Sequence, residues 1–82
     1  MINLNLKVKL NTFEMLFFTN RTLLYDSNVA LQIFIENENF EDVIIISEVI
    51  RNIEKTNICL KKVVRIKQKE YRRNTLAKIY NQ

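Results

Sequence analysis

The amino-acid sequence predicts a small α+β domain in which an antiparallel sheet is covered by helices on one face. Two segments of alternating apolar and polar residues predict strands, and an apolar stripe at helical spacing predicts a central helix between Asn39 and Glu54. The expected element order is β-α-β-β-α, followed by a basic and mainly helical C-terminal segment. The 82 residues are expected to form one domain, in which residues 1–54 hold the sheet and central helix and residues 55–82 form the basic segment.

The first alternating segment is residues 2–10, where every even position is Ile, Leu or Val and every odd position is Asn or Lys. This pattern predicts a half-buried strand with one solvated face. Residues 11–18 then predict a short helix that Asn11 and Glu14 could cap. The bulky apolar side chains of this stretch also fit a strand, but the helix is the preferred interpretation.

Two further strands are predicted on either side of a hairpin turn. Thr19-Asn20 interrupts the pattern, and residues 22–25 predict a short strand. Asp26-Ser27-Asn28 supplies turn residues in a chain that has no Gly. Residues 29–35 alternate again, with Val, Leu and Ile at the odd positions, and predict the next strand.

The central helix is predicted to begin at Asn39, whose side chain can accept a hydrogen bond from the first turn, with Asp42 three residues later. Five apolar residues then recur at a period near 3.6: Val43, Ile46, Val49, Ile50 and Ile53. Because β-branched residues favour sheet, the run from Val43 to Ser47 also fits a buried strand. The periodicity continues for two turns after Ser47, which favours the helix.

The C-terminal segment fits two kinds of structure. As a helix, it gathers Leu60, Val63, Val64 and Tyr71 on one side and most of its cations on the other. Residues 58–66 also alternate as a strand would. The apolar residues after position 75 point away from the earlier stripe on a continuous helix, so we expect a break within residues 67–74 and a final helix through about Tyr80.

The composition excludes several kinds of active site. The chain has no Gly, Pro, His or Trp and a single cysteine, Cys59, while Asn, Ile and Lys are abundant, which is typical of an AT-rich genome. The usual zinc sites, His-based catalysis, an intrachain disulfide and the usual Gly-rich phosphate loop are therefore all excluded. Cys59 lies between Ile58 and Leu60 and is expected to be buried. We expect a non-catalytic protein without a metal, cofactor or small-molecule substrate.

The location predicted from the sequence is intracellular, in the cytoplasm or an organelle. No stretch approaches the roughly 18 consecutive apolar residues of a membrane span. The alternating N-terminal residues also lack the solid apolar run of a signal peptide.

The charge distribution predicts a surface that binds a polyanion. Residues 55–82 contain nine Lys or Arg and one acidic residue, a net charge of +8, whereas residues 1–54 carry −4. Each phosphate neutralised by such a segment releases counterions. The residues expected to bind phosphate are Lys61, Lys62, Arg65, Lys67, Lys69, Arg72, Arg73 and Lys78. Tyr71 and Tyr80 could stack on unpaired bases, although Tyr71 also fits the edge of a core.

These features predict a small RNA-binding component of a larger ribonucleoprotein assembly, of ribosomal-protein type, with RNA and other protein subunits as partners. The alternative is a protein-interaction subunit of a multiprotein complex. In the order LNLKVKL, NVALQIF and SEVIRNI, residues 2–53 resemble the small dimerising subunit of the KEOPS tRNA-modifying complex, although the spacing after Tyr25 and the basic tail depart from it. A virus- or phage-encoded inhibitor also fits the composition.

Overall fold

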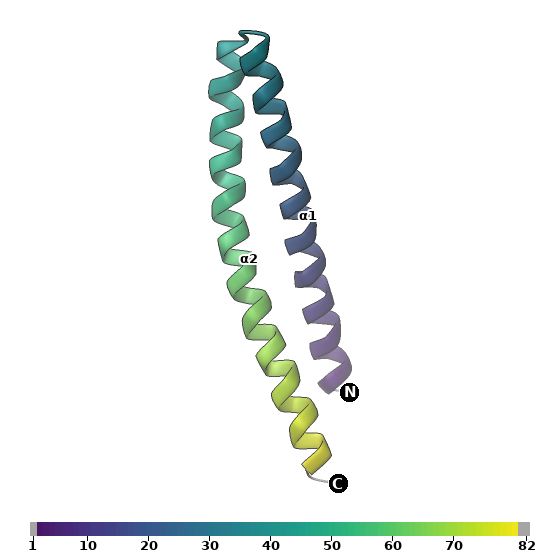
Figure 1. Ribbon diagram of the computed structural model, residues 1–82. Helices are drawn as coiled ribbons and strands as arrows, with labels where there is room; N and C mark the ends of the chain where they lie inside the picture. Colours follow the sequence, from purple (N-terminus) through teal and green to yellow (C-terminus); the bar gives the residue numbers. More distant parts are fainter. Residues whose placement is uncertain (1, 81–82) are drawn as a thin grey trace.

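The chain folds into a long hairpin of two helices (Figure 1). The structure, a computed structural model, describes the backbone of residues 2–80 and the side chains of residues 5–77 and 79. Helix α1 spans Ile2–Glu36 and helix α2 spans Phe40–Tyr80, and they lie side by side in opposite directions. The hairpin measures 65 × 14 × 14 Å. Its length follows from α2, because 41 residues at 1.5 Å each extend about 60 Å.

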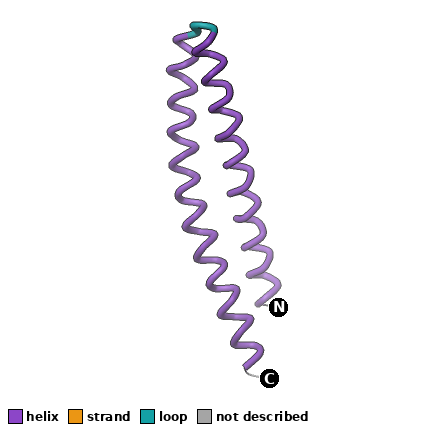
Figure 2. Tube along the Cα trace, viewed as in Figure 1, coloured by secondary structure: helices purple, strands orange, loops and turns teal. Residues whose placement is uncertain are grey.

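The predicted antiparallel sheet is wrong. Residues 2–80 contain two helices and one short turn and no strand (Figure 2). The segments predicted as strands, residues 2–10, 22–25 and 29–35, all lie inside α1, as does the predicted turn at Asp26-Ser27-Asn28.

Helix α1 forms because its apolar residues follow a second pattern that extends through most of the helix. Nine residues recur at alternating intervals of four and three and are buried or half-buried: Leu6, Leu10, Phe13, Phe17, Asn20, Leu24, Ser27, Leu31 and Phe34. Only α2 is available to cover them. Val8, which would share a strand face with Leu6 and Leu10, is instead exposed. Burial of a long helical face outweighs the local strand preference, and no Gly or Pro interrupts the helix.

Polar residues are accommodated within α1, and one of them, Asn28, belongs to the predicted turn. The hydroxyls of Thr12 and Thr22 donate to the carbonyls of Val8 and Phe18, at 2.8 and 3.2 Å. The side-chain amide of Asn28 donates in the same way to the Leu24 carbonyl. Each bond reaches back four residues, so these side chains are satisfied without leaving the helix.

The two helices are joined at Asn37–Asn39 by a Schellman turn. The Asn39 N–H donates to the Phe34 carbonyl at 2.9 Å and the Glu38 N–H donates to the Ile35 carbonyl at 3.1 Å. Glu38 has a φ of 57°, the left-handed conformation that this turn requires and that Gly usually supplies. In a chain with no Gly, a glutamate takes that position.

The helix predicted after Asn39 is present, but it is much longer than predicted. The Asn39 carbonyl accepts the first helical hydrogen bond from the Val43 N–H, and Glu41 and Asp42 lie in the first turn, where the helix dipole favours them. The helix then continues without interruption to Tyr80. The break expected within residues 67–74 and the strand considered for residues 58–66 are therefore both wrong.

Helix α2 packs against α1 through the same alternation of intervals. Its ten buried or half-buried seam residues are Val43, Ile46, Ile50, Ile53, Asn57, Leu60, Val64, Lys67, Tyr71 and Asn74. Most of the apolar stripe predicted for the central helix is confirmed, except that Val49 is exposed. Cys59, expected to be buried, is also exposed. This seam is typical of an antiparallel pair in which helices interlock by knobs into holes.

A polar pair fixes the register of the two helices. The Asn20 side-chain amide donates to the Ile53 carbonyl at 3.1 Å and to the Asn57 Oδ1 at 3.4 Å. The core that surrounds this pair is thin. Among the described side chains, the buried apolar ones are Leu10, Ile50, Ile53 and Val64.

Candidate interaction surfaces

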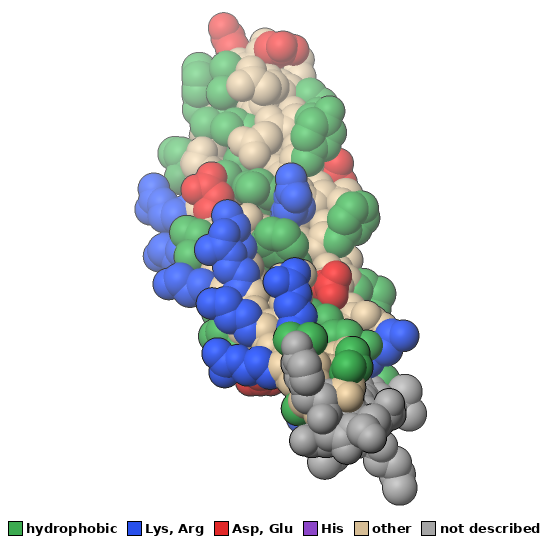
Figure 3. Space-filling view, turned by 60° about the horizontal axis from the view of Figure 1, so that its bottom comes forward, with side chains coloured by type: hydrophobic (Ala, Val, Ile, Leu, Met, Phe, Trp, Pro, Cys, Tyr) green, Lys and Arg blue, Asp and Glu red, His purple; other side chains and the backbone are tan. Residues whose placement is uncertain are grey.

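The hairpin is strongly polarised along its length. Residues 22–50, which include the turn, contain six acidic residues and no Lys or Arg, a net charge of −6. The rest of the chain contains all thirteen Lys and Arg and three acidic residues, a net charge of +10. Figure 3 shows acidic side chains at the turn end and basic ones gathered toward the end that carries the termini. We refer to these as the turn end and the open end.

Seven exposed cations form a basic face on the outer side of α2. They are Lys55, Lys61, Lys62, Arg65, Lys69, Arg72 and Arg73. At 100° per residue, they fall within about one third of the helix circumference, and at 1.5 Å per residue they extend about 27 Å along it. The straight helix therefore holds these charges in one row that points away from α1.

The structure separates the residues predicted to bind phosphate into two groups. Six of them are exposed on the basic face, namely Lys61, Lys62, Arg65, Lys69, Arg72 and Arg73. Lys67 lies in the seam instead, where it is half-buried and its Nζ is 3.4 Å from the Glu70 carboxylate. Tyr71 is also half-buried in the seam, which fits its alternative interpretation as a residue at the edge of a core. The side chains of Lys78 and Tyr80 lie outside the described residues.

Lys55 belongs to the basic face, and the sequence interpretation did not name it as a phosphate ligand. It precedes Lys62 and Lys69 by seven and fourteen residues. On a helix, this spacing places all three on one line, so the signal was present once α2 was recognised as continuous.

A second surface, on the outer side of α1, is apolar. Five large residues there are between 44% and 71% exposed: Val8, Met15, Phe18, Tyr25 and Val29. Asn11, Thr22 and Gln32 fall between them, and the eight residues recur at intervals of three and four with no charge among them. We call these eight residues the outer stripe. The stripe repeats the spacing of the α1–α2 seam, but the hairpin leaves it uncovered.

Shallow hollows along the outer stripe have the shape that a helical partner would use. Phe18, Arg21, Thr22 and Tyr25 line one hollow of about 320 Å³. These positions are i, i+3, i+4 and i+7, the four residues that form a hole for a side-chain knob in coiled coils. Arg21 leans toward the helix seam, because its guanidinium lies over the Phe17 ring at 5.9 Å. Arg21 is the one charged residue among the four that border the hollow.

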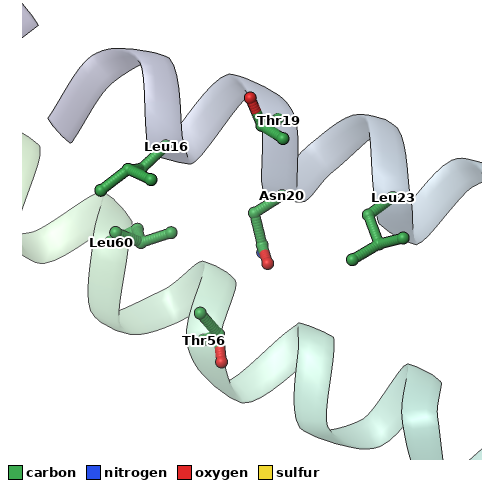
Figure 4. Close-up of a pocket in the computed structure, with 6 residues that line it drawn as sticks. All are labelled: Leu16, Thr19, Asn20, Leu23, Thr56 and Leu60. Atoms are coloured by element: carbon green, nitrogen blue, oxygen red, sulfur yellow. The ribbon is translucent and has the colours of Figure 1, made fainter. Parts of the chain in front are cut away.

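A groove midway along the hairpin contains no group suited to catalysis. Figure 4 shows Leu16, Thr19, Asn20 and Leu23 of α1 and Thr56 and Leu60 of α2 around this groove, which has a volume of about 300 Å³. None of the six side chains ionises near neutral pH. Their lining can accept an apolar side chain but supplies neither a proton donor nor a nucleophile of lowered pKa.

Further features bear on metal and membrane binding. Among the described residues, no three His, Cys, Asp or Glu side chains come together as a metal site would require. Neither described helix contains an apolar stretch long enough to span a membrane.

Comparison of the chain with known protein families, curated proteins and solved structures finds no match. The inference of function therefore rests on the two surfaces.

Proposed function

We propose that this chain is a non-catalytic assembly subunit, which binds another helical protein through the outer stripe of α1. The observation that carries the proposal is the row of exposed apolar residues at coiled-coil spacing, with Phe18 and Tyr25 about 70% exposed near its centre. A helix that is apolar on more than one side is normally covered on each of those sides. Helix α2 covers one side of α1, and a partner would cover the other.

The total surface supports the same conclusion. The hairpin exposes 6752 Å², whereas a compact monomer of this mass exposes about 5,200 Å². The excess, about 1,500 Å², is comparable to the total area buried in a standard protein–protein interface. Exposed patches of this kind on soluble proteins commonly mark interaction sites.

A photo-crosslinking amino acid tests this function in the source cell. Benzoylphenylalanine in place of Tyr25 lies on the outer stripe, and the matched control in place of Lys62 lies on the basic face. We expect a discrete protein adduct from the Tyr25 position and none of the same mass from the control. Absence of any protein adduct at Tyr25, with the protein expressed and folded, would contradict the proposal.

A second candidate function is RNA binding as a component of a ribonucleoprotein assembly of ribosomal-protein type. It is favoured by the basic face, where Arg65, Arg72 and Arg73 can each hold a phosphate with two parallel hydrogen bonds. The two candidates use opposite helices and are compatible within one assembly. RNA affinity measured at three salt concentrations tests this candidate, because counterion release predicts a linear fall of log K with log salt. The intracellular location of the protein stays a prediction from the sequence.

A further inference from the structure

We propose that the partner on the outer stripe is a second copy of this chain, packed so that the two α1 helices run antiparallel at the centre. The inference rests on the proposed assembly function and names its partner. It would give a four-helix assembly with α1 and its copy inside and both α2 helices outside.

The outer stripe is suited to pairing with itself. It supplies large knobs, Phe18 and Tyr25, and between them a hollow above the smaller Thr22. A two-fold axis near Thr22 would place Phe18 of each copy beside Tyr25 of the other, on either side of the two Thr22 residues, as an interface between identical patches requires. The eight residues of the stripe carry no charge, and Arg21, which borders the hollow, holds its guanidinium over the Phe17 ring, so the pairing would bury no unpaired charge along the centre of the stripe.

The lengthwise charge distribution selects the antiparallel orientation. With the axis near the middle of α1, the turn end of one copy, at −6, lies beside the open end of the other, at +10. A parallel arrangement would place the two acidic ends together and the two basic ends together. Complementary charges favour the first arrangement and like charges oppose the second.

The basic face excludes α2 as the pairing surface. Two copies meeting through α2 would bring two rows of seven cations against each other.

The available area also suffices for a stable dimer. A compact dimer of twice the mass exposes about 8,600 Å², about 4,900 Å² less than two separate hairpins. An elongated dimer would bury less than this difference of about 4,900 Å². Half of the difference already exceeds the roughly 2,000 Å² at which obligate dimer interfaces begin.

The full-length chain tests the proposal by sedimentation equilibrium or light scattering. We expect a mass of about twice 9.9 kDa at micromolar concentration. The double variant Phe18→Glu/Tyr25→Glu should weaken association at least a hundredfold. The control Ile58→Glu/Ile66→Glu makes the same change at two exposed apolar residues of α2, and it should leave the mass unchanged.

Spin labels at the turn test the orientation. In a Cys59→Ser background, Glu38→Cys would carry one label per copy. An antiparallel pair centred near Thr22 separates the two labels by about 50 Å, since each lies 16 residues from the axis at 1.5 Å per residue. A parallel pair would bring them within roughly 25 Å, about two helix diameters.

Each outcome gives a distinct answer. A monomeric parent chain overturns the inference, whatever the variants do. If the Tyr25 crosslink in cells then joins a different protein, the assembly function stands and only the second copy is excluded. If no protein adduct forms there, the assembly function fails as well. A dimer that is unaffected by Phe18→Glu/Tyr25→Glu, or one with a short label distance, also overturns the proposed arrangement.

Discussion

The turn between the helices provides a sharp test of the hairpin, because a glutamate occupies a conformation that suits glycine. Glu38 has a φ of 57°, and its N–H and that of Asn39 donate the two hydrogen bonds that close the end of α1. A left-handed conformation costs an L-residue about 1–2 kcal/mol. Glycine avoids that cost, but its larger conformational entropy in the unfolded chain lowers the stability of the folded state by about 0.4–1 kcal/mol. Glu38→Gly should therefore stabilise the hairpin by about 0.5–1 kcal/mol, which corresponds to about 2–8 °C in Tm for a domain of this size.

Two controls separate the backbone effect from the charge effect. Glu38→Gln removes the carboxylate but keeps the Cβ, so it should give none of the backbone gain. Glu54→Gly removes a carboxylate from an exposed position in the middle of α2 and should lower the free energy of unfolding by about 1 kcal/mol. Thermal unfolding followed by circular dichroism at one fixed protein concentration measures all three, since association would otherwise shift Tm. If Glu38→Gly is neutral or destabilising while Glu54→Gly behaves as expected, the left-handed turn is not the native one.

Two further predictions concern the core and the basic face. Ile50→Asp places an unpaired charge in the α1–α2 seam and should unfold the hairpin, whereas Ile58→Asp, at an exposed site on the same helix, should leave most of its helicity; circular dichroism distinguishes the two, and a stable Ile50→Asp protein would contradict the seam. If the basic face binds single-stranded RNA, changing Lys61, Arg65 and Arg72 together to Gln should lower the slope of log K against log salt by about two units at unchanged fold, and an unchanged slope would exclude these residues as phosphate ligands.

The central helix could be predicted from the sequence because its signals are local. Asn39 at the start, acidic residues in the first turn and a 3.6-residue stripe all agree, and the structure confirms the helix. The same stripe correctly placed Ile50 and Ile53 in the core. What local signals did not reveal was the length of the helix, since the seam continues beyond Glu54 through polar residues such as Asn57 and Lys67.

The fold of residues 2–36 was misread because two periodicities coexist there. Between Ile2 and Leu10, alternate positions are apolar, which fits a strand perfectly over nine residues. The helical pattern becomes evident only when the spacing of four and three is followed from Leu6 to Phe34. Asn20 and Ser27 obscure it, because polar residues occupy two of its seam positions. Their roles depend on α2, as the Asn20 bond to the Ile53 carbonyl shows, and so could not be read from α1 alone.

The sequence predicted most of these cations as phosphate ligands, but it did not predict which of them share one face of a helix. Treating α2 as broken near residue 70 left Lys67 equivalent to its neighbours and left Lys55 out. A continuous helix assigns Lys67 to the seam beside Glu70 and aligns Lys55 with Lys62. The apolar outer stripe could not be predicted for a related reason, since the sequence places Phe18 and Tyr25 in separate predicted elements and their alignment appears only on one continuous helix.

The unequal compositions of the two helices follow from the positions that the proposed assembly gives them. α1 is apolar on both the seam and the outer stripe, so it needs cover on two sides, and the hairpin supplies one. α2 carries seven cations that face outward between Lys55 and Arg73, so water or a polyanion suits that side of it. An inner α1 and an outer α2 satisfy both requirements at once. Because the two surfaces belong to different helices, changes at Phe18 and Tyr25 should affect association, and changes at Arg65 should affect polyanion binding, with little influence on each other.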